Sequence, residues 1–264
     1  MALDLPGVEP VALESKSEFR LGSVSQNVAN DYGTPNLLFL YYIPFLPDDK
    51  KVDLDAIKDE FQTWNAWELG QAESQLIQHV ENGNLPSDDS IASRITRNDY
   101  RSKAINFFRL TSQAWLKVAT EATAKKSAET TKDTVNGVII QELWSLAREE
   151  QLQTPFSVVL NSPSGSIDIN KENKLFYTHV YYQYDHDSRT FRPVVQDTTF
   201  TIKVLGGSES KSEKDNVTVE IALSTVTYNF DRKFWRDNRH QGQAAITSGE
   251  PIREQMALDF FVDS

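Results

Sequence analysis

Asp185, His186 and Asp187 stand side by side and form a compact group of side chains that could ligate a metal ion or exchange protons. A metal site needs further ligands at a defined spacing, and the neighbouring sequence supplies none. Alternating apolar and polar residues flank the group on both sides, as expected for two paired strands. Asp and Ser favour turns because their side chains bond nearby backbone amides. The pattern therefore predicts that these residues form a solvent-exposed hairpin turn and bind no metal.

The other histidines give no catalytic constellation. His79 falls in a polar helical stretch, His179 at a strand position expected to be solvated or at an edge, and His240 in a polar loop. They form no visible triad, and the chain lacks the usual hydrolase, zinc-protease and nucleotide-binding motifs. It also lacks cysteine, so it has no thiol nucleophile and no disulfide. We expect no catalytic residue, no metal, no cofactor and no enzymatic activity. An enzyme of an unrecognised type is the remaining alternative.

The charge of the chain restricts its partners. Its 264 residues carry a formal net charge of −11 at pH 7, which opposes binding to nucleic acid and to anionic lipid. The first residues show no basic segment followed by an apolar run, so we expect no secretory signal. No apolar run reaches the ~20 residues that a membrane helix needs. We expect a protein made soluble in the cytoplasm without a classical signal peptide, and released by another route if it acts on a host.

The chain divides into an arm and a single domain. Residues 1–35 are rich in Pro, Gly, Ser and Asn, and we interpret them as an N-terminal arm that can be removed or exchanged. Residues 36–264 are predicted to form one domain. Its first elements are a buried strand at 36–46 and two helical stretches between Asp53 and Gly83.

Two further amphipathic helices are predicted at 98–123 and 127–150. The first places Ile105, Phe108 and Trp115 on one face. Both have a charged outer side, which is typical of helices that cover a sheet. The apolar face of the second helix consists of Val135, Val138, Ile139, Leu143 and Leu146.

From residue 155 onward the sequence changes to strand patterns, with alternation of apolar and polar residues. In the last strand Val219, Ile221 and Leu223 share one face. Helices that precede antiparallel strands indicate an α+β fold. The predicted strands are 156–160, 176–184, 198–204 and 216–230.

The order of these elements resembles the fold group of the bacterial cytolytic delta-endotoxins (Cyt toxins) and the fungal volvatoxin, with the Erwinia virulence factor as a more distant member. The likeness lies in FYTHVYYQYDHDSRTFRPVVQDTTFTIKV at 176–204, where an aromatic-rich strand and a short turn lead to a strand that ends in Ile-Lys-Val, and in the long strand after it. LLFLYYIPFLPDDKKVDLDAIKDEF at 37–61 resembles the family's first strand and helix. The likeness spans residues 36–234 and rests on pattern, without an invariant motif.

The resemblance implies a three-layer α/β/α sandwich with a central, mainly antiparallel sheet wrapped by amphipathic helices. It also implies a membrane-interacting toxin or virulence protein, pore-forming or membrane-lytic, that acts on eukaryotic, insect-type host membranes. Its partner would be a lipid membrane or a fatty-acyl ligand, and copies would assemble on membranes, including as a dimer through the N-terminal arm. The alternative is a non-lytic virulence factor that binds lipid or a host protein through an apolar cavity between helices and sheet.

Six apolar residues are candidates for lipid contact, on the 98–123 helix and on the strand that it is expected to face. They become exposed if the helix moves off the sheet. Each large side chain contributes ~1.5–3 kcal/mol when buried, so the closed form is favoured in water. The predicted helices are more polar than those of lytic family members, and no cysteine matches the lipid-modified cysteine of the virulence factor. The candidates are Ile105, Phe108, Trp115, Val219, Ile221 and Leu223.

Overall fold

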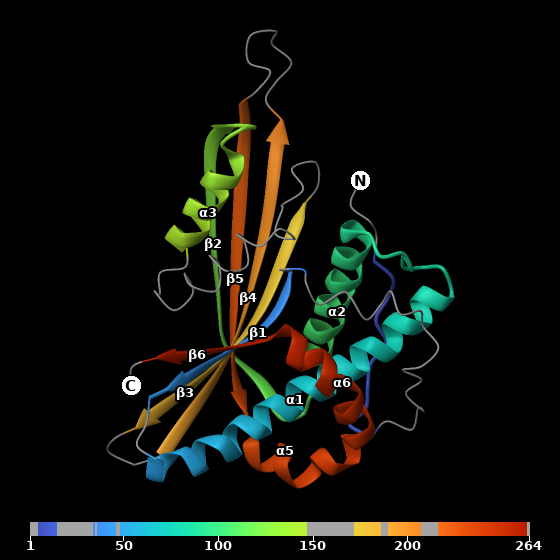
Figure 1. The fold of residues 1–264 in the computed structure, drawn as a ribbon, viewed down its shortest axis with the longest axis vertical. Helices are drawn as coiled ribbons and strands as arrows, with labels where there is room; N and C mark the ends of the chain where they lie inside the picture. The colour runs from blue at the N-terminus through green and yellow to red at the C-terminus, as the bar shows by residue number, and fades with distance from the viewer. Residues whose placement is uncertain are drawn as a thin grey trace.

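The computed structural model describes residues 5–14, 34, 36–45, 48–146, 172–185, 190–206 and 216–262. In this part of the chain six strands form one sheet in the order β2-β5-β4-β3-β1-β6, with helices on both faces (Figure 1). The strands are β1 (Leu37–Pro44), β2 (Leu116–Thr131), β3 (Asn173–Asp185), β4 (Thr190–Gly206), β5 (Asn216–Phe230) and β6 (Ala257–Val262). The helices are α1 (Asp48–Glu81), α2 (Ile91–Thr111), α3 (Val135–Leu146), α5 (Arg232–Asn238) and α6 (Gln243–Met256), with the 3-10 helix η2 (Arg239–Gly242) after α5.

The sheet is mainly antiparallel. β2 pairs with β5, β5 with β4 and β4 with β3 in antiparallel ladders, whereas β1 runs parallel to both β3 and β6. Successive side chains of a strand point to opposite faces of the sheet, and helices cover apolar residues on both faces. The prediction of an α+β sandwich with a mainly antiparallel central sheet is therefore confirmed.

Two hydrophobic cores lie on the two faces of the sheet. The first core lies between the sheet and α1, α2, α5 and α6, and contains Phe61 and Trp64 of α1. The second core lies between the sheet and α3, and contains Ile139 and Leu143. Figure 1 shows α3 beside β2 and β5 at one end of the long strands, and α1, α5 and α6 around the other end. The two helical layers thus cover different parts of the sheet as well as different faces.

α1 and α6 approach each other closely at two glycines. A Cβ atom on Gly249 would lie 1.8 Å from the carbonyl oxygen of Ala66, and one on Gly70 would lie 2.1 Å from that of Ala245. Both distances are far below a van der Waals contact, so only residues without a Cβ allow this packing. The close approach fixes α6, and with it the position of β6 immediately after it.

The helical pattern from Asp53 to Gly83 forms one helix, where two were predicted. α1 continues without interruption through Asp48–Glu81 and ends where Gly83 adopts a positive φ of 74°, the usual conformation after a helix C-terminus. α2 begins after Ser90, whose side chain accepts a hydrogen bond from the Ser93 amide.

The predicted helix at 98–123 is wrong beyond residue 111. α2 ends at Thr111, and Leu116–Thr131 form β2, which pairs with β5 over its whole length. The segment is rich in Ala, Lys and Glu, which favour helices. Pairing with a long neighbouring strand decides its conformation, because strand formation depends on tertiary context more than on local preference. The predicted helix at 127–150 is correspondingly shorter, since α3 is Val135–Leu146 and 147–150 lie outside the described residues.

Several predicted features lie wholly or partly outside the described residues. These include the strand at 156–160, and His186 and Asp187 at the hairpin tip. The two strands that flank this tip are confirmed, because Asp185 of β3 pairs with Thr190 of β4. Residues 5–14 of the predicted arm are described and contact α1 and α2. The division into an arm and a single domain stays a prediction.

Candidate functional site

A buried group of polar side chains, here called the Arg109 cluster, joins the helices to the sheet. Arg109 of α2 donates to the Glu68 carboxylate of α1 through Nε (2.7 Å) and Nη2 (2.6 Å). Its Nη1 donates to Thr178 Oγ1 of β3 (2.9 Å) and to the Asp197 carboxylate of β4. Gln113 donates to Glu68 Oε1 (2.6 Å). All five side chains are buried. One guanidinium therefore connects two helices to two strands.

The Arg109 cluster holds one positive charge against two carboxylates. Burial lowers the pKa of Arg109, but the charges of Asp197 and Glu68 raise it overall above its ordinary value, so Arg109 stays protonated. Burial raises the pKa of Glu68, an effect that Arg109 opposes. The guanidinium also lies over the ring of Trp64, 4.7 Å from its centroid. Buried on all sides, the Arg109 cluster acts as a connection between layers and offers no access to a substrate.

A second buried ion pair lies within the helical layer. Arg101 of α2 donates to Glu73 of α1 through Nε (2.7 Å) and Nη2 (3.1 Å), and to Asn98 Oδ1 (2.7 Å). These three residues all belong to α1 and α2. The pair keeps the two helices together, whereas the Arg109 cluster resists their separation from the sheet. If the layers part, α1 and α2 are expected to move as one unit.

The predicted lipid-contact residues divide between the two cores and do not form one surface. The expectation that the helical set faces the strand set is wrong, because α2 covers one face of the sheet and the odd-numbered residues of β5 point to the other. A single movement of one helical layer therefore cannot expose both sets. Whether either set contacts lipid stays a prediction. Ile105, Phe108 and Trp115 lie in the first core, Val219 and Ile221 lie in the second, and Leu223 is partly buried against the second.

His179 is fully buried on the sheet face that carries the second core. Its Nδ1 lies 3.2 Å from the hydroxyl oxygen of Tyr42, and its ring stacks near the rings of Tyr42 (5.8 Å) and Tyr181 (6.0 Å). Nε2 has no hydrogen-bond partner among the described residues. Burial lowers the pKa of His179 to about 3. The expected solvated or edge position is wrong, because β3 lies between β4 and β1 in the sheet, and alternation along a strand does not reveal which face is covered.

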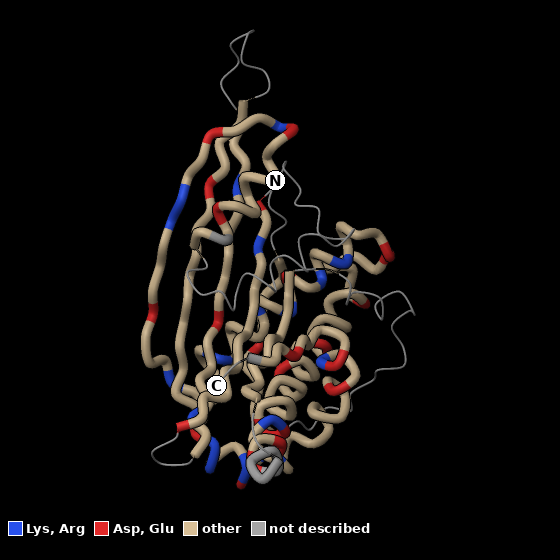
Figure 2. The backbone as a smooth tube through the Cα atoms, turned by 60° about the vertical axis from the view of Figure 1, so that its left-hand side comes forward, with Lys and Arg blue, Asp and Glu red and all other residues tan. Residues whose placement is uncertain are grey.

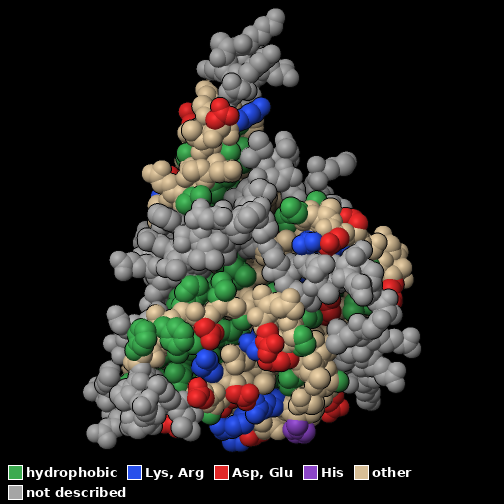
Figure 3. All heavy atoms as spheres, viewed as in Figure 1, with side chains coloured by type: hydrophobic (Ala, Val, Ile, Leu, Met, Phe, Trp, Pro, Cys, Tyr) green, Lys and Arg blue, Asp and Glu red, His purple; other side chains and the backbone are tan. Residues whose placement is uncertain are grey.

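Two exposed aromatic side chains lie next to each other at the ends of β1 and β6. Phe45 is 60% exposed and Phe261 is 63% exposed, and their ring centroids are 5.9 Å apart. On the other face of the same strands, Tyr42 and Phe260 stack at 5.6 Å. Figure 3 shows hydrophobic side chains gathered at this end of the sheet. Because β6 is the last strand in the sheet order, the Phe45–Phe261 pair lies at an edge of the sheet.

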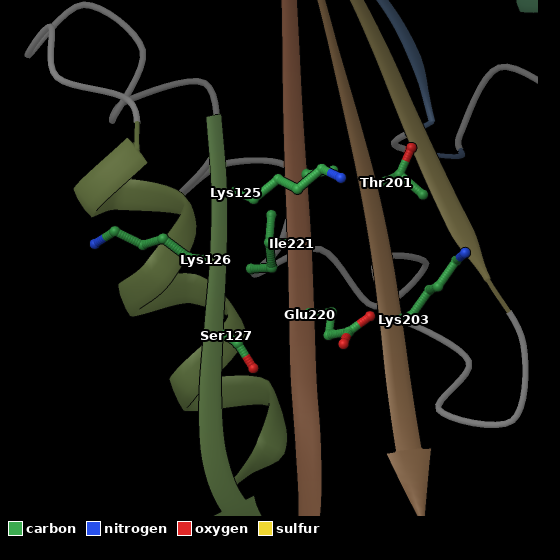
Figure 4. A pocket seen from close by; sticks show the side chains of 8 residues that line it. Lys125, Lys126, Ser127, Thr201, Lys203, Glu220 and Ile221 are labelled. Carbon is green, nitrogen blue, oxygen red and sulfur yellow. The ribbon is translucent and has the colours of Figure 1, made fainter. Parts of the chain in front are cut away.

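A groove of about 420 Å³ lies on the sheet where it extends beyond the helices (Figure 4). It is lined by Lys125 of β2, Thr201 and Lys203 of β4, and Glu220 of β5, among others. Glu172 hydrogen-bonds Lys203 at 2.8 Å and raises its pKa. The groove is open and carries charges of both signs, so its chemistry selects no single class of ligand.

The described residues lack two common kinds of site. No group of three or more His, Asp or Glu side chains within them is placed to hold a metal ion. None of the helices in the described ranges combines the length and the hydropathy that crossing a bilayer requires. Because the turn at 185–187 lies partly outside these ranges, its expected lack of metal stays a prediction.

Comparison with known proteins gives a distant likeness of fold. No model of a known protein family matches the chain, and no curated protein sequence matches it. Among solved structures, the chain is similar to one described as the structure of the Evf virulence factor, with a TM-score of 0.39 and 12% identity over 90% of this chain and 95% of that chain. A likeness this distant does not establish membership of the Cyt toxin family, and no activity or residue role is transferred from it.

The Arg109 cluster was not predicted, although the sequence carries a signal for it. Glu68 follows Trp64 by four residues, and Arg109 follows Ile105 by four residues. Residues four apart share a helix face, so both charges stand on apolar faces that lead into the first core. A charge on such a face indicates a buried partner. No comparable signal existed for the Phe45–Phe261 pair, which depends on the parallel pairing of β1 with β6 from the far end of the domain.

Proposed function

We propose that the protein binds lipid membranes and that the Phe45–Phe261 pair makes the first contact. The observation that supports this proposal is the exposure of two large aromatic rings side by side at an edge of the sheet. Adjacent exposed apolar side chains mark interaction surfaces more often than isolated ones do. Aromatic rings insert readily at the boundary between head groups and acyl chains. The proposal includes a role as a toxin or virulence protein that acts on eukaryotic host membranes, without enzymatic activity.

The first contact is expected to be weak. Burying a whole Phe side chain contributes ~1.5–3 kcal/mol, so the exposed parts of two rings contribute about 2–4 kcal/mol. A free energy of about −4 kcal/mol corresponds to a dissociation constant near 1 mM. The net charge of −11 also opposes docking on anionic lipid. We therefore expect weak binding at neutral pH, with a preference for zwitterionic lipid.

Firm attachment and membrane damage require more apolar surface than this pair supplies. Separation of α1 and α2 from the sheet would expose Ile105 and Phe108, which are fully buried in the closed form. The Arg109 cluster opposes this step, because separation would leave charges without partners in a poorly solvated place. Lysis, with assembly of copies on the membrane, would thus depend on a lipid-induced opening of the first core.

Binding without lysis is the alternative within the same class of function. The space between the helices and the sheet is filled by packed side chains that include Phe61, Trp64 and Tyr182. An acyl chain carried there would have to displace them. This packing favours contact at the exposed edge over storage of a lipid in the interior.

Vesicle flotation and dye release on the same samples test the proposal. Wild-type protein should float with phosphatidylcholine vesicles, and the double variant Phe45→Ser, Phe261→Ser should lose most of that binding. Leu110→Ser is the matched control, because Leu110 is 57% exposed but lies on α2, away from the pair. Equal flotation of all three proteins would refute the pair as the contact. Flotation without dye release would assign the non-lytic alternative.

A further inference from the structure

In the described part of the chain, no second strand pairs with the outer edge of β2. β2 is the first strand in the sheet order, and β5 is its only strand partner among the described residues. Residues 117–125 are all exposed, and the β2 tube forms a border of the molecule in Figure 2. Along an antiparallel strand, every second residue directs its amide and carbonyl away from the neighbouring strand. The edge can therefore accept a further strand.

Charges of alternating sign lie along one face of this edge. Beyond the irregularity between Val118 and Thr120, the odd-numbered residues of β2 share a face of the sheet. Glu121, Lys125 and Glu129 follow each other there at intervals of four residues, and Figure 2 shows acidic and basic segments in turn along the β2 tube. In the part of the chain that the structure describes, none of these three has an ion pair. Three charges at a free edge are thus available to a partner.

We propose that two copies of the chain pair through β2 in an antiparallel arrangement, about a two-fold axis at Thr123. A two-fold axis makes such an interface self-complementary. In this register Glu121 of each copy lies opposite Lys125 of the other, and Thr123 lies opposite itself. Ala122 of each copy lies opposite Ala124 of the other, so small side chains occupy the second face near the axis. The two sheets become one continuous sheet.

The same charges disfavour neighbouring registers. An axis at Lys125 would place this residue opposite itself and Glu121 opposite Glu129, and like charges in direct opposition destabilise a strand pair. An axis at Ser127 would match Lys125 with Glu129, but it lies beside Lys126, where α3 contacts β2, and would place the two α3 helices side by side. The axis at Thr123 lies within the regular stretch that follows the irregularity and pairs residues 120–126 of the two copies. The register at Thr123 is therefore the one that combines matched charges with separated α3 helices.

Among the described residues, the elements that flank the edge leave room for a second copy. α3 contacts β2 near Lys126, whose Nζ lies 3.2 Å from the Glu142 carboxylate. On the same sheet face, Ala122 and Ala124 are exposed. The two-fold symmetry places the α3 helices of the two copies at opposite ends of the paired strands, so these helices do not contact each other. Charged edge strands usually resist pairing. Here Lys125 of each copy lies opposite Glu121 of the other, and the β2 edge is fully occupied once two copies have paired.

Sedimentation velocity of charge variants in the absence of lipid tests this interface. Wild-type protein should form dimers. Either Glu121→Lys or Lys125→Glu alone places like charges opposite each other at both symmetry-related contacts between residues 121 and 125. We therefore expect the dimer dissociation constant to rise about tenfold or more. In an equimolar mixture of the two variants every such contact is again between opposite charges, and mixed dimers should form. Lys233→Glu on α5, at a residue that is 79% exposed, is the control and should leave the dimer intact.

Single-cysteine cross-linking tests the register. The chain has no cysteine, so Thr123→Cys introduces a single thiol into each copy. In the proposed dimer the two thiols lie opposite each other at the two-fold axis, close enough to form a disulfide. Thr123→Cys should oxidise rapidly to a covalent dimer, and Ser127→Cys should not. A monomeric wild-type protein, failure of the mixed charge variants to associate, or faster cross-linking at Ser127 would each overturn the proposal. Membrane binding does not enter these readouts, so failure here is distinct from failure of the proposed function.

Discussion

Replacement of His179 by Gln is expected to remove a large part of the acid sensitivity of folding. His179 is fully buried, and burial lowers its pKa from 6.5 to about 3. In the unfolded chain the imidazole takes up a proton as the pH falls below about 6.5, whereas in the folded protein it stays neutral down to about pH 3. Because the folded-state pKa is the lower one, the contribution of His179 to stability is complete above pH 6.5 and is lost progressively as the pH falls toward 3.

The size of the effect follows from these two pKa values. Each unit of difference between them is worth ~1.4 kcal/mol, so the full effect below pH 3 is about 5 kcal/mol. Carboxylates also titrate at such a low pH, which makes pH 5 more informative. Between pH 7 and pH 5 the unfolded imidazole goes from about one quarter protonated to almost fully protonated, and His179 costs the folded state about 2 kcal/mol.

Urea unfolding at pH 7 and pH 5, followed by tryptophan fluorescence, measures this difference. The free energy of unfolding of the wild type should fall by about 2 kcal/mol more than that of His179→Gln between the two pH values. The Gln amide can still bond the Tyr42 hydroxyl, and His179→Phe is a second variant that cannot titrate. His240→Gln is the control at an exposed histidine. If the wild type and both His179 variants lose the same free energy on acidification, the reasoning is refuted.

Three further predictions concern packing. Arg109→Met leaves two buried carboxylates without their counter-charge and should lower the free energy of unfolding in urea by about 3–5 kcal/mol; a loss below about 1 kcal/mol would contradict the assigned role. Gly249→Ala should lower the free energy of unfolding by about 2–4 kcal/mol, because its Cβ would lie 1.8 Å from a carbonyl oxygen. Gly137→Ala on α3, where a Cβ meets no atom within 4 Å, should raise the free energy of unfolding by about 0.5–1 kcal/mol. Similar effects of the two substitutions would count against the close contact between α1 and α6. Deletion of residues 1–14 should lower Tm by about 5 °C, because four apolar residues of this segment pack against the first core; an unchanged Tm would show that the segment is dispensable.

The strand patterns of the second half were predictable because an amphipathic strand repeats every two residues. Phe176 to Tyr184 and Asn216 to Phe230 show this repeat, and both fall inside observed strands. The same repeat correctly grouped the residues of β5 that face α3. It does not specify which helix covers that face. The predicted contact between β5 and the 98–123 helix is wrong for this reason.

The errors arise where distant segments decide the outcome. β2 has the composition of a solvated helix and becomes a strand only beside β5, which is about a hundred residues away in the sequence. His179 is buried because both faces of β3 are covered, and no local pattern reports this. The Phe45–Phe261 pair exists because β1 pairs with β6 in parallel. Parallel pairing of two strands so far apart in the sequence leaves no local sequence pattern. Local periodicity thus predicts element type better than it predicts sites.

Site-specific labelling tests the proposed membrane contact most directly. Phe261→Cys and the control Leu110→Cys each carry a single thiol, because the chain has no cysteine, and the two parent side chains are similarly exposed, at 63% and 57%. An environment-sensitive fluorophore on residue 261 should shift to the blue and resist an aqueous quencher when phosphatidylcholine vesicles are added, whereas the same fluorophore on residue 110 should not change. A response at residue 110 without one at residue 261, or vesicle binding with no response at residue 261, would contradict the account.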